Sequence, residues 1–210
     1  MNTPKKPSRY PSRSTDDLQE IYQVLDESRF CTLAYVQDGK PMQIPTGFCR
    51  IGDKLYVHAS SKSHFLDGLI EADLVSFSIM IFDALVLAAT AFDHSVNYRS
   101  VILHSKAIEI HDVDLKTKVL AVFTDTYIPG RMNELPAITA EELSVTRVAE
   151  LDIKSAILKR RTGGVGGDIA GSKVWCGIVP AAMTYGTPLV DSALDDNILL
   201  PDYLKNFKIS

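Results

Sequence analysis

Cysteine and tryptophan are scarce in this sequence. Its 210 residues include three cysteines and one tryptophan. Cys31, Cys49 and Cys176 form no CxxC or CxxxC pair, so the pattern of a structural zinc site is missing. Isolated cysteines in odd number are typical of a reduced protein, and the basic first residues are not followed by the apolar run of a secretory signal. We therefore expect a cytoplasmic location.

Long apolar runs and an excess of one charge are also missing. The most apolar stretch, 79–91, is interrupted by Asp83 and is shorter than the roughly 20 residues that a membrane helix needs. The 22 basic residues stand against 26 acidic ones, so neither a membrane protein nor a general nucleic-acid binder is expected. Hydrophobic residues make up 46% of the chain, a value typical of a globular domain.

Several catalytic signatures are absent as well. The five histidines show no HExxH or HxH spacing, so no catalytic metal is expected. The chain has no GxxxxGK[ST] nucleotide loop and no GxSxG hydrolase elbow. The glycine-rich stretch 162–171 has no GxGxxG, and a flexible loop is the simpler interpretation.

What is present is a series of short strand patterns separated by tight turns. Strands are expected at 30–36, 42–51, 55–59, 74–89, 94–111, 145–158 and 174–179, and the segment 74–89 is either a pair of strands or one bent strand. Helices are expected after a cap at Ser14 or Thr15, at 64–72 and at 114–128. Because these strands do not alternate with helices, the pattern favours a mainly β fold, an antiparallel barrel with peripheral helices, over a Rossmann-type sheet.

One domain is expected between two irregular ends. Residues 1–13 are rich in proline and basic side chains and are expected to form an extended arm. Residues 14–183 form the domain, and residues 184–210 are expected to be an irregular tail that packs on it.

Within the domain, Pro45 indicates an edge strand, a bulge or a place where a ligand replaces strand pairing.

Two polar segments are candidates for ligand binding. The turn 60–63, Ser-Ser-Lys-Ser, precedes an expected helix, where hydroxyls, an ammonium and free N–H groups suit a phosphate. A plain helix cap explains the same residues. The segment 94–101 opens a long expected strand, and its Arg99 could balance a phosphate, although a polar strand end with a surface arginine explains it equally well.

Three further features leave alternatives open. Trp175, in an expected strand, either packs in the core or contacts a planar cofactor. His58 is a candidate proton donor or a structural histidine. The three cysteines lie in apolar surroundings and are expected to be inert packing residues.

Five segments, in this order, resemble the pyridoxamine 5'-phosphate oxidase-like flavoproteins, in the branch of the nitroimidazole-resistance and flavin-nucleotide-binding proteins. They are IPT at 44–46, LYVHAS at 55–60, HSVNYRSV at 94–101, PGR at 129–131 and VWCGIVP at 174–180. The likeness spans roughly residues 10 to 190. The family implies an FMN-binding split β-barrel, antiparallel and Greek-key-like, that works as a homodimer with flavin sites at the interface.

The resemblance also implies which residues contact the FMN. Pro45 and Thr46 would face the flavin ring, the turn 60–63 would hold the phosphate, and Trp175 would approach the flavin. The implied cofactor-binding residues are Pro45, Thr46, His58, Ser60, Ser61, Lys62, Ser63, Asn97, Tyr98, Arg99, Ser100, Lys159, Arg161 and Trp175. No catalytic residue is assigned.

Two departures from the family bear on function. Ser105 stands where relatives often carry glycine, and the arginine-rich substrate pattern of true pyridoxamine 5'-phosphate oxidases is missing, so vitamin B6 oxidation is not expected. The leading hypothesis is an FMN-dependent oxidoreductase that uses a small-molecule electron donor and acceptor. The alternatives are a flavin carrier or sensor without turnover, and a relative that binds another planar cofactor such as heme or a deazaflavin.

Overall fold

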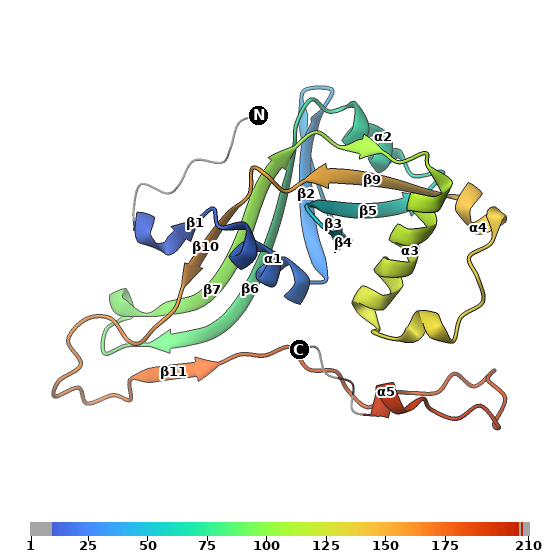
Figure 1. Ribbon diagram of the computed structural model, residues 1–210. Helices are drawn as coiled ribbons and strands as arrows, with labels where there is room; N and C mark the ends of the chain where they lie inside the picture. Colours follow the sequence, from blue (N-terminus) through green and yellow to red (C-terminus); the bar gives the residue numbers. More distant parts are fainter. Residues whose placement is uncertain (1–9, 206, 208–210) are drawn as a thin grey trace.

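Two antiparallel sheets form the centre of the protein. The computed structural model describes residues 10–205 and residue 207. The larger sheet has the order β1-β10-β7-β6-β2-β3, with β11 also paired to β6, and the smaller has the order β4-β5-β9-β8 (Figure 1). The strands are β1 (Ser14–Thr15), β2 (Phe30–Gln37), β3 (Lys40–Gly47), β4 (Cys49–Ile51), β5 (Lys54–Ser60), β6 (Val75–Leu87), β7 (Ser95–Ser105), β8 (Ile108–Glu109), β9 (Thr146–Asp152), β10 (Ile157–Arg161) and β11 (Gly177–Pro180).

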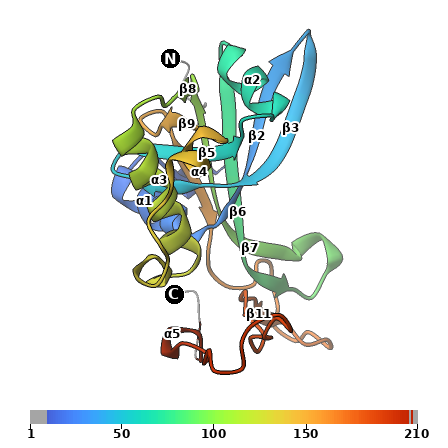
Figure 2. The ribbon, with the colours of Figure 1, turned by 90° about the vertical axis from the view of Figure 1, so that its right-hand side faces the viewer.

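Helices lie at the periphery of the sheets, as Figure 2 shows. They are α1 (Leu18–Glu27), α2 (His64–Glu71), α3 (Val113–Tyr127), α4 (Ala140–Ser144), α5 (Asp202–Lys205) and the 3-10 turns η1 (Pro11–Arg13), η2 (Ala91–Asp93) and η3 (Arg131–Asn133). The architecture is the mainly antiparallel split barrel that the sequence predicted. No helix in the described part of the chain is long and apolar enough to cross a membrane.

Three expected strands are each divided between the two sheets. The segment 42–51 becomes β3 and β4, 94–111 becomes β7 and β8, and 145–158 becomes β9 and β10. The residues at the crossings include Phe48 and Ala107, both 1% exposed. The crossing at Phe48 has no polar residue to mark it, and the other two are marked only by Lys106 and by the short turn at Lys154 and Ser155. Single long strands were therefore expected, and these boundaries were predicted wrongly.

The start of the first helix was also predicted wrongly. Ser14 and Thr15 do not cap it but form β1, which pairs with β10. The cap is Asp17, whose Oδ1 accepts hydrogen bonds from the backbone N–H groups of Gln19 and Glu20 at 2.8 and 3.1 Å. A carboxylate at this position also interacts favourably with the helix dipole.

Pro45 lies on an edge strand, one of the three positions that the sequence allowed. It belongs to β3, the last strand of the larger sheet, and pairs with Thr32 of β2. The hairpin between the two strands turns at Asp38 and Gly39, with φ values of 50° and 73°. Two successive positive φ angles are the geometry that two-residue hairpins prefer, and the turn sets the register of the pair.

The core lies between the sheets and α1. Leu33, Phe77 and Leu103 are fully buried, and the rings of Phe48 and Phe77 meet edge to face at 5.1 Å. Burial raises the pKa of the Cys31 and Cys49 thiols to about 12, so both stay protonated and behave as the packing residues that the sequence predicted.

Strand β6 contains a bulge that divides it into two halves. Its register against β7 shifts between Phe82 and Ala84, and Asp83 is the additional residue. A bulge bends a strand and increases its twist. The first half belongs to the barrel, whereas the second half pairs with the start of β7 and with β11 and extends beyond the barrel (Figure 1).

The chain leaves the sheet after β11 as a C-terminal arm, residues 181–205. This arm runs beneath the barrel in both ribbon views and carries little regular structure besides α5 (Figures 1 and 2). Its far end is tied to η3, since the Tyr203 hydroxyl donates to Glu134 at 2.8 Å and accepts from Arg131 at 3.1 Å. Most of its side chains are exposed.

Candidate functional site

A fork in the larger sheet creates the main cavity. One edge of β6 pairs with β2 through residues 76–78 and with β11 through residues 84–87, so residues 79–83 lie between two diverging strands. The space there, which we call the fork cavity, has a volume of about 620 Å³. Its walls come from β6, the end of α1, the start of β2 and the start of the C-terminal arm, through Glu27, Ser28, Arg29, Phe30, Met80, Ile81, Phe82, Asp83, Arg99, Ala181, Ala182 and Met183.

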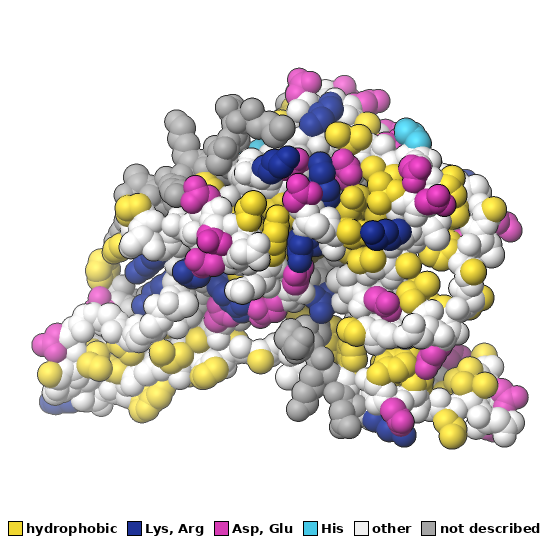
Figure 3. All heavy atoms as spheres, in the orientation of Figure 1, with side chains coloured by type: hydrophobic (Ala, Val, Ile, Leu, Met, Phe, Trp, Pro, Cys, Tyr) yellow, Lys and Arg dark blue, Asp and Glu magenta, His cyan; other side chains and the backbone are white. Residues whose placement is uncertain are grey.

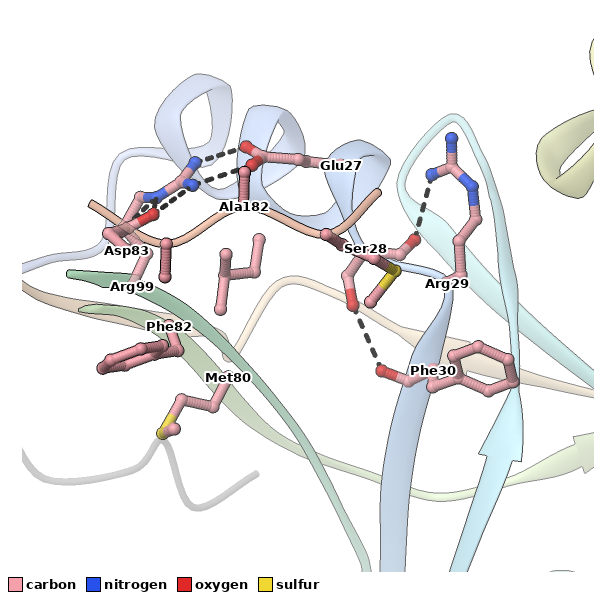
Figure 4. Close-up of a pocket in the computed structure, with 12 residues that line it drawn as sticks. Glu27, Ser28, Arg29, Phe30, Met80, Phe82, Asp83, Arg99 and Ala182 are labelled. Carbon is pink, nitrogen blue, oxygen red and sulfur yellow. Dashed lines mark hydrogen bonds and ion pairs between the residues drawn. The ribbon is translucent and has the colours of Figure 1, made fainter. Parts of the chain in front are cut away.

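A cluster of three charged side chains forms one wall of the fork cavity. Arg99 of β7 donates to both carboxylate oxygens of Glu27, with its Nη2 2.7 Å from Oε1. It also binds Asp83 at the bulge, through Nη2 at 2.7 Å and Nε at 3.1 Å. Figure 4 shows the three side chains pointing toward one another. The cluster therefore joins the end of α1 to the bulge of β6.

The electrostatic effect of this cluster falls on Arg99. The hydrogen bonds that the guanidinium donates to Glu27 and then to Asp83 raise its pKa well above the ordinary value, against the opposing effect of burial. Two carboxylates against one guanidinium leave the cluster with a formal charge of −1. Arg99 thus already has two anionic partners. A phosphate, which Arg99 was predicted to balance, would have to compete with these two carboxylates for the guanidinium.

A second hollow adjoins the fork cavity on the outward face of the larger sheet. This sheet hollow has a volume of about 460 Å³ and shares Phe30 and Met80 with the fork cavity. Those two side chains are 63% and 67% exposed. Its lining residues are Phe30, Cys31, Thr32, Pro45, Ser78, Ile79, Met80, Ser100 and Ile102. Two of the predicted cofactor contacts, Pro45 and Ser100, therefore lie in one concave surface, and Thr46 lies next along β3.

The predicted phosphate turn lies elsewhere in the chain. Ser60 to Ser63 end β5 in the smaller sheet, next to α2, far from the lower half of β7 in both ribbon views (Figures 1 and 2). The Ser60 hydroxyl accepts from the Lys62 N–H at 3.3 Å, and the Ser61 N–H donates to the Val145 carbonyl at 2.7 Å. Ser63 is the N-cap of α2, but its side chain makes no capping bond. A single chain does not bring this turn to Arg99.

Asn97 and Arg161 hold the glycine-rich loop. Arg161 donates to the Asn97 side chain and, at 3.2 Å, to the Gly164 carbonyl. The Asn97 amide donates to the Gly163 carbonyl at 3.0 Å. Both residues were predicted from the sequence to contact the cofactor, and in the structure both contact the loop that follows β10.

The remaining predicted residues of this region lie on the outward face. Tyr98 pairs with Phe82 of β6, and Lys159 pairs with Ser100, whose hydroxyl donates to the Lys159 carbonyl at 3.3 Å. Tyr98, Ser100 and Lys159 alternate with the inward-facing Arg99 and Asn97 along the two strands. The two cations of the predicted basic element therefore differ in their contacts. Arg161 binds Asn97 and the glycine-rich loop, whereas Lys159 points outward near the sheet hollow.

Trp175 and His58 lie apart from both hollows. Trp175 precedes β11, is 66% exposed and is not a core residue; a Cβ at Gly177 would lie 2.6 Å from its ring. His58 packs edge to face on Phe123 of α3 at 4.3 Å, its Nδ1 is buried without a hydrogen-bond partner, and burial lowers its pKa. The described residues contain no group of three or more His, Cys, Asp or Glu side chains that could hold a metal ion.

Most residues that line the fork cavity were not predicted from the sequence. Glu27 and Asp83 are isolated acidic residues, and nothing nearby in the sequence joins them to Arg99. The apolar walls were the one part that the sequence could have indicated, because residues 79–82 read Ile-Met-Ile-Phe without alternating with polar residues. A strand that is apolar on both faces is covered on both faces. Met80 and Phe82 point outward here and remain 67% and 40% exposed.

Comparisons with known proteins agree with this architecture. A flavocytochrome from Azotobacter vinelandii has 29% sequence identity and a TM-score of 0.88, over 97% of this chain and 96% of its own. A FAD- and heme-binding protein from Mycobacterium smegmatis has 33% identity and a TM-score of 0.85, over 90% of this chain and 94% of its own. A 5-nitroimidazole antibiotic resistance protein from Bacteroides thetaiotaomicron shares the fold, at 17% identity and a TM-score of 0.60 over 70% of this chain and 86% of its own.

A search of curated proteins finds no match. The family model described as pyridoxamine 5'-phosphate oxidase matches residues 17–160, more than half of the sequence. This segment runs from the cap of α1 to Arg160 in β10 and includes every strand of the two sheets except β1 and β11. The chain therefore belongs to the pyridoxamine 5'-phosphate oxidase family.

Proposed function

We propose that this protein binds a flavin across the fork cavity and the sheet hollow. The observation that carries the proposal is the exposed pair Phe30 and Met80, which lies where the two hollows meet. The volumes of about 620 and 460 Å³ are in the range of small-molecule sites. An aromatic ring and a thioether suit the face of a planar ring system. Hydroxyls of Thr32, Ser78 and Ser100 offer hydrogen bonds beside them.

A bound flavin would supply hydride and single-electron transfer. The residues of this chain would bind and orient it: Phe30 and Met80 would exclude water from the ring, and the Arg99 cluster would hold the end of α1 against the bulge. Both carboxylates of the fork cavity are engaged by Arg99, so no catalytic acid or base is assigned. We propose an oxidoreductase with a small-molecule electron donor and acceptor, and a carrier or sensor is the outcome if no turnover is measured.

We propose that the working form is a homodimer with the flavin at the interface. The outward face of the larger sheet supports this, because Phe30, Met80, Phe82, Leu85 and Ile102 are between 40% and 67% exposed on it. A patch of this kind on one sheet is typical of a protein interface. Light scattering that gives the mass of one chain at micromolar concentration would contradict the dimer.

The identity of the flavin is a matter for direct measurement. The sequence resemblance implies FMN, whereas the Mycobacterium smegmatis relative is a FAD- and heme-binding protein. The experiment is an absorption spectrum of the freshly purified protein, with mass spectrometry of whatever heat releases. Flavin bands support the proposal and the released mass distinguishes FMN from FAD, whereas protein that neither carries nor takes up flavin contradicts it. Consumption of NADH or NADPH by loaded protein then separates an enzyme from a carrier.

We propose that the turn 60–63 binds the flavin phosphate. Its support is the N-terminus of α2, which has free N–H groups and no side-chain cap. Replacement of Lys62 by Ala should weaken FMN binding by about 1.5–3 kcal/mol, one to two decades, and leave riboflavin binding unchanged. The control is Lys40→Ala in the β2–β3 turn. Equal FMN affinity in wild type and Lys62→Ala would remove the turn from the site.

We propose heme as a second cofactor, because the two relatives at 29% and 33% identity are a flavocytochrome and a FAD- and heme-binding protein. The residue that would hold the heme iron is His64, whose side chain is fully exposed and whose Nδ1 lies 3.8 Å from the Asp67 carboxylate. Iron-binding histidines commonly keep one ring nitrogen on a carboxylate and offer the other to the metal. Loss of a Soret band in His64→Ala but not in His94→Ala supports this ligand, and an unchanged band contradicts it.

A further inference from the structure

The C-terminal arm carries large apolar side chains that nothing in the described part of its own chain covers. Leu189, Val190 and Leu199 are 93%, 77% and 81% exposed. The arm nevertheless has a fixed course, because β11 anchors its start, Tyr203 binds η3, and the rings of Tyr185 and Phe207 meet at 4.8 Å. An anchored segment with bare apolar side chains is built to be covered by something outside the chain.

The surface area of the chain points to a large partner. A compact protein of 23.1 kDa exposes about 9,700 Å² by the usual size relation, whereas this chain exposes 13268 Å². Were the 13 residues outside the described part fully extended, they would account for about 2,100 Å² of the difference. About 1,500 Å² per chain remains, or about 3,000 Å² for two chains, a value typical of an obligate homodimer.

The charges of the arm indicate where it would lie. Residues 184–205 contain four aspartates, at 191, 195, 196 and 202, against one basic residue, Lys205. The segment of β10 and the loop after it is basic: Lys159 is half-buried, Lys173 is exposed, and neither has a side-chain ion pair among the described residues. In Figure 3, apolar and acidic side chains lie over the arm at the lower right, and basic side chains gather at the left, where β10 runs. The two surfaces are complementary but lie at opposite ends of one chain.

We propose that the C-terminal arm packs on a second copy of this chain, with its aspartates next to the partner's basic surface around β10 and its apolar side chains buried against the partner. A two-fold axis lets each arm cover the other chain, so both unpartnered surfaces are satisfied by one symmetric contact. Since Ala181, Ala182 and Met183 at the start of the arm line the fork cavity, the exchange would fix one wall of the cofactor site. This inference rests on the proposed homodimer.

The test is photo-crosslinking of the full-length protein. Leu189 is replaced by a photoreactive phenylalanine, and the matched control carries it at Val113, an apolar residue at the start of α3 that is 60% exposed. Irradiation should join most Leu189-labelled chains into covalent dimers and leave the Val113-labelled chains uncrosslinked. Because position 189 is almost wholly exposed, the substitution should not disturb folding. Crosslinks only within a chain, or none, in a protein that light scattering shows to be dimeric would overturn the exchange and leave the homodimer standing.

Charge reversal provides a second measurement that distinguishes exchange from a contact within one chain. One variant carries Asp195→Lys and Asp196→Lys, and the other carries Lys159→Glu and Lys173→Glu. If the arm is exchanged, like charges meet in a dimer of either variant alone. In a mixed dimer, each arm instead meets side chains of opposite charge on the other chain. Native mass spectrometry should then find more than about three-quarters mixed dimers instead of the statistical half. A statistical mixture contradicts the proposed contact, and a monomer in wild type contradicts the proposed homodimer as well.

Discussion

The barrel and the C-terminal arm cover their apolar side chains in different ways. In the barrel, Leu33, Phe77 and Leu103 have no exposed surface, and they are contributed by strands that pair with one another. In the arm, Leu189 and Leu199 are almost wholly exposed, although the segment is anchored at both ends. The barrel therefore completes its core with its own chain, whereas the arm lacks a counterpart, and mutations should affect folding in the first and association in the second.

The largest expected effect is on the barrel. Phe77→Ala removes a fully buried ring that packs on Phe48, and should lower the free energy of unfolding by about 3–5 kcal/mol. Leu189→Ala in the arm should change it by less than about 0.5 kcal/mol under monomeric conditions. Urea unfolding at low protein concentration measures both. Similar losses in the two variants would mean that the arm also folds against its own chain.

The Arg99 cluster lies between the barrel and the C-terminal arm, and breaking it should have an intermediate effect on the free energy of unfolding. Arg99→Leu leaves Glu27 and Asp83 without their shared cation and should destabilise the flavin-free protein by roughly 1–3 kcal/mol. Arg99→Lys should recover part of this, because a single ammonium cannot bind both carboxylates in the same geometry. Unchanged stability together with weaker binding of FMN than of riboflavin would instead support the phosphate contact that the sequence predicted.

A smaller effect concerns His58 and pH. Burial lowers its pKa from the ordinary 6.5, so below pH 6.5 the unfolded chain takes up a proton that the folded chain does not. Stability is then lost as the pH falls. His58→Phe removes the unpartnered Nδ1, should change stability at pH 7 by about 1 kcal/mol or less, and should flatten the dependence on pH between 7 and 5. Thermal unfolding across this range, with His64→Ala as control, measures the difference.

The smallest expected effect is on Trp175, which lies at the start of β11. Because it is 66% exposed, Trp175→Leu should change the stability of the flavin-free chain by less than about 0.5 kcal/mol. As the only tryptophan, it also reports on binding, and its emission should fall when flavin is added if it approaches the ring in the dimer. Unchanged emission at saturating flavin would exclude the contact that the resemblance implies.

The sequence predicted the parts of the fold that depend on neighbouring residues. The edge position of Pro45 and the helix 64–72 follow from local chemistry, and the structure has them within a residue or so. The crossing between the sheets at Phe48 could not be seen, since an apolar residue looks the same in a strand and between two strands. Long strands in a small barrel should be treated as possible pairs of strands in different sheets.

The candidate site was predictable where it rests on motif residues and not where it rests on distant pairs. Pro45 and Ser100 were chosen from motifs and lie in one hollow. Glu27, Asp83 and Arg99 come together only through the fold, from positions up to 72 residues apart, and no local pattern records that. Trp175 was placed inside a strand, but its exposed position before β11 shows that an apolar run near the end of the domain need not belong to the core.

The pairing of β1 with β10 has a consequence for the order in which the protein can assemble. Ser14 faces Lys159 in this ladder, so the first strand waits for about 145 residues to be made before its partner exists. At ribosomal rates of about 5–20 residues per second, the delay is roughly 7–30 seconds. The β2–β3 hairpin needs fewer than about twenty residues and can form in microseconds. Nascent chains should therefore fold from the hairpin outward and add β1 and β11 to the sheet last, with the first apolar strands exposed to chaperones in the interval.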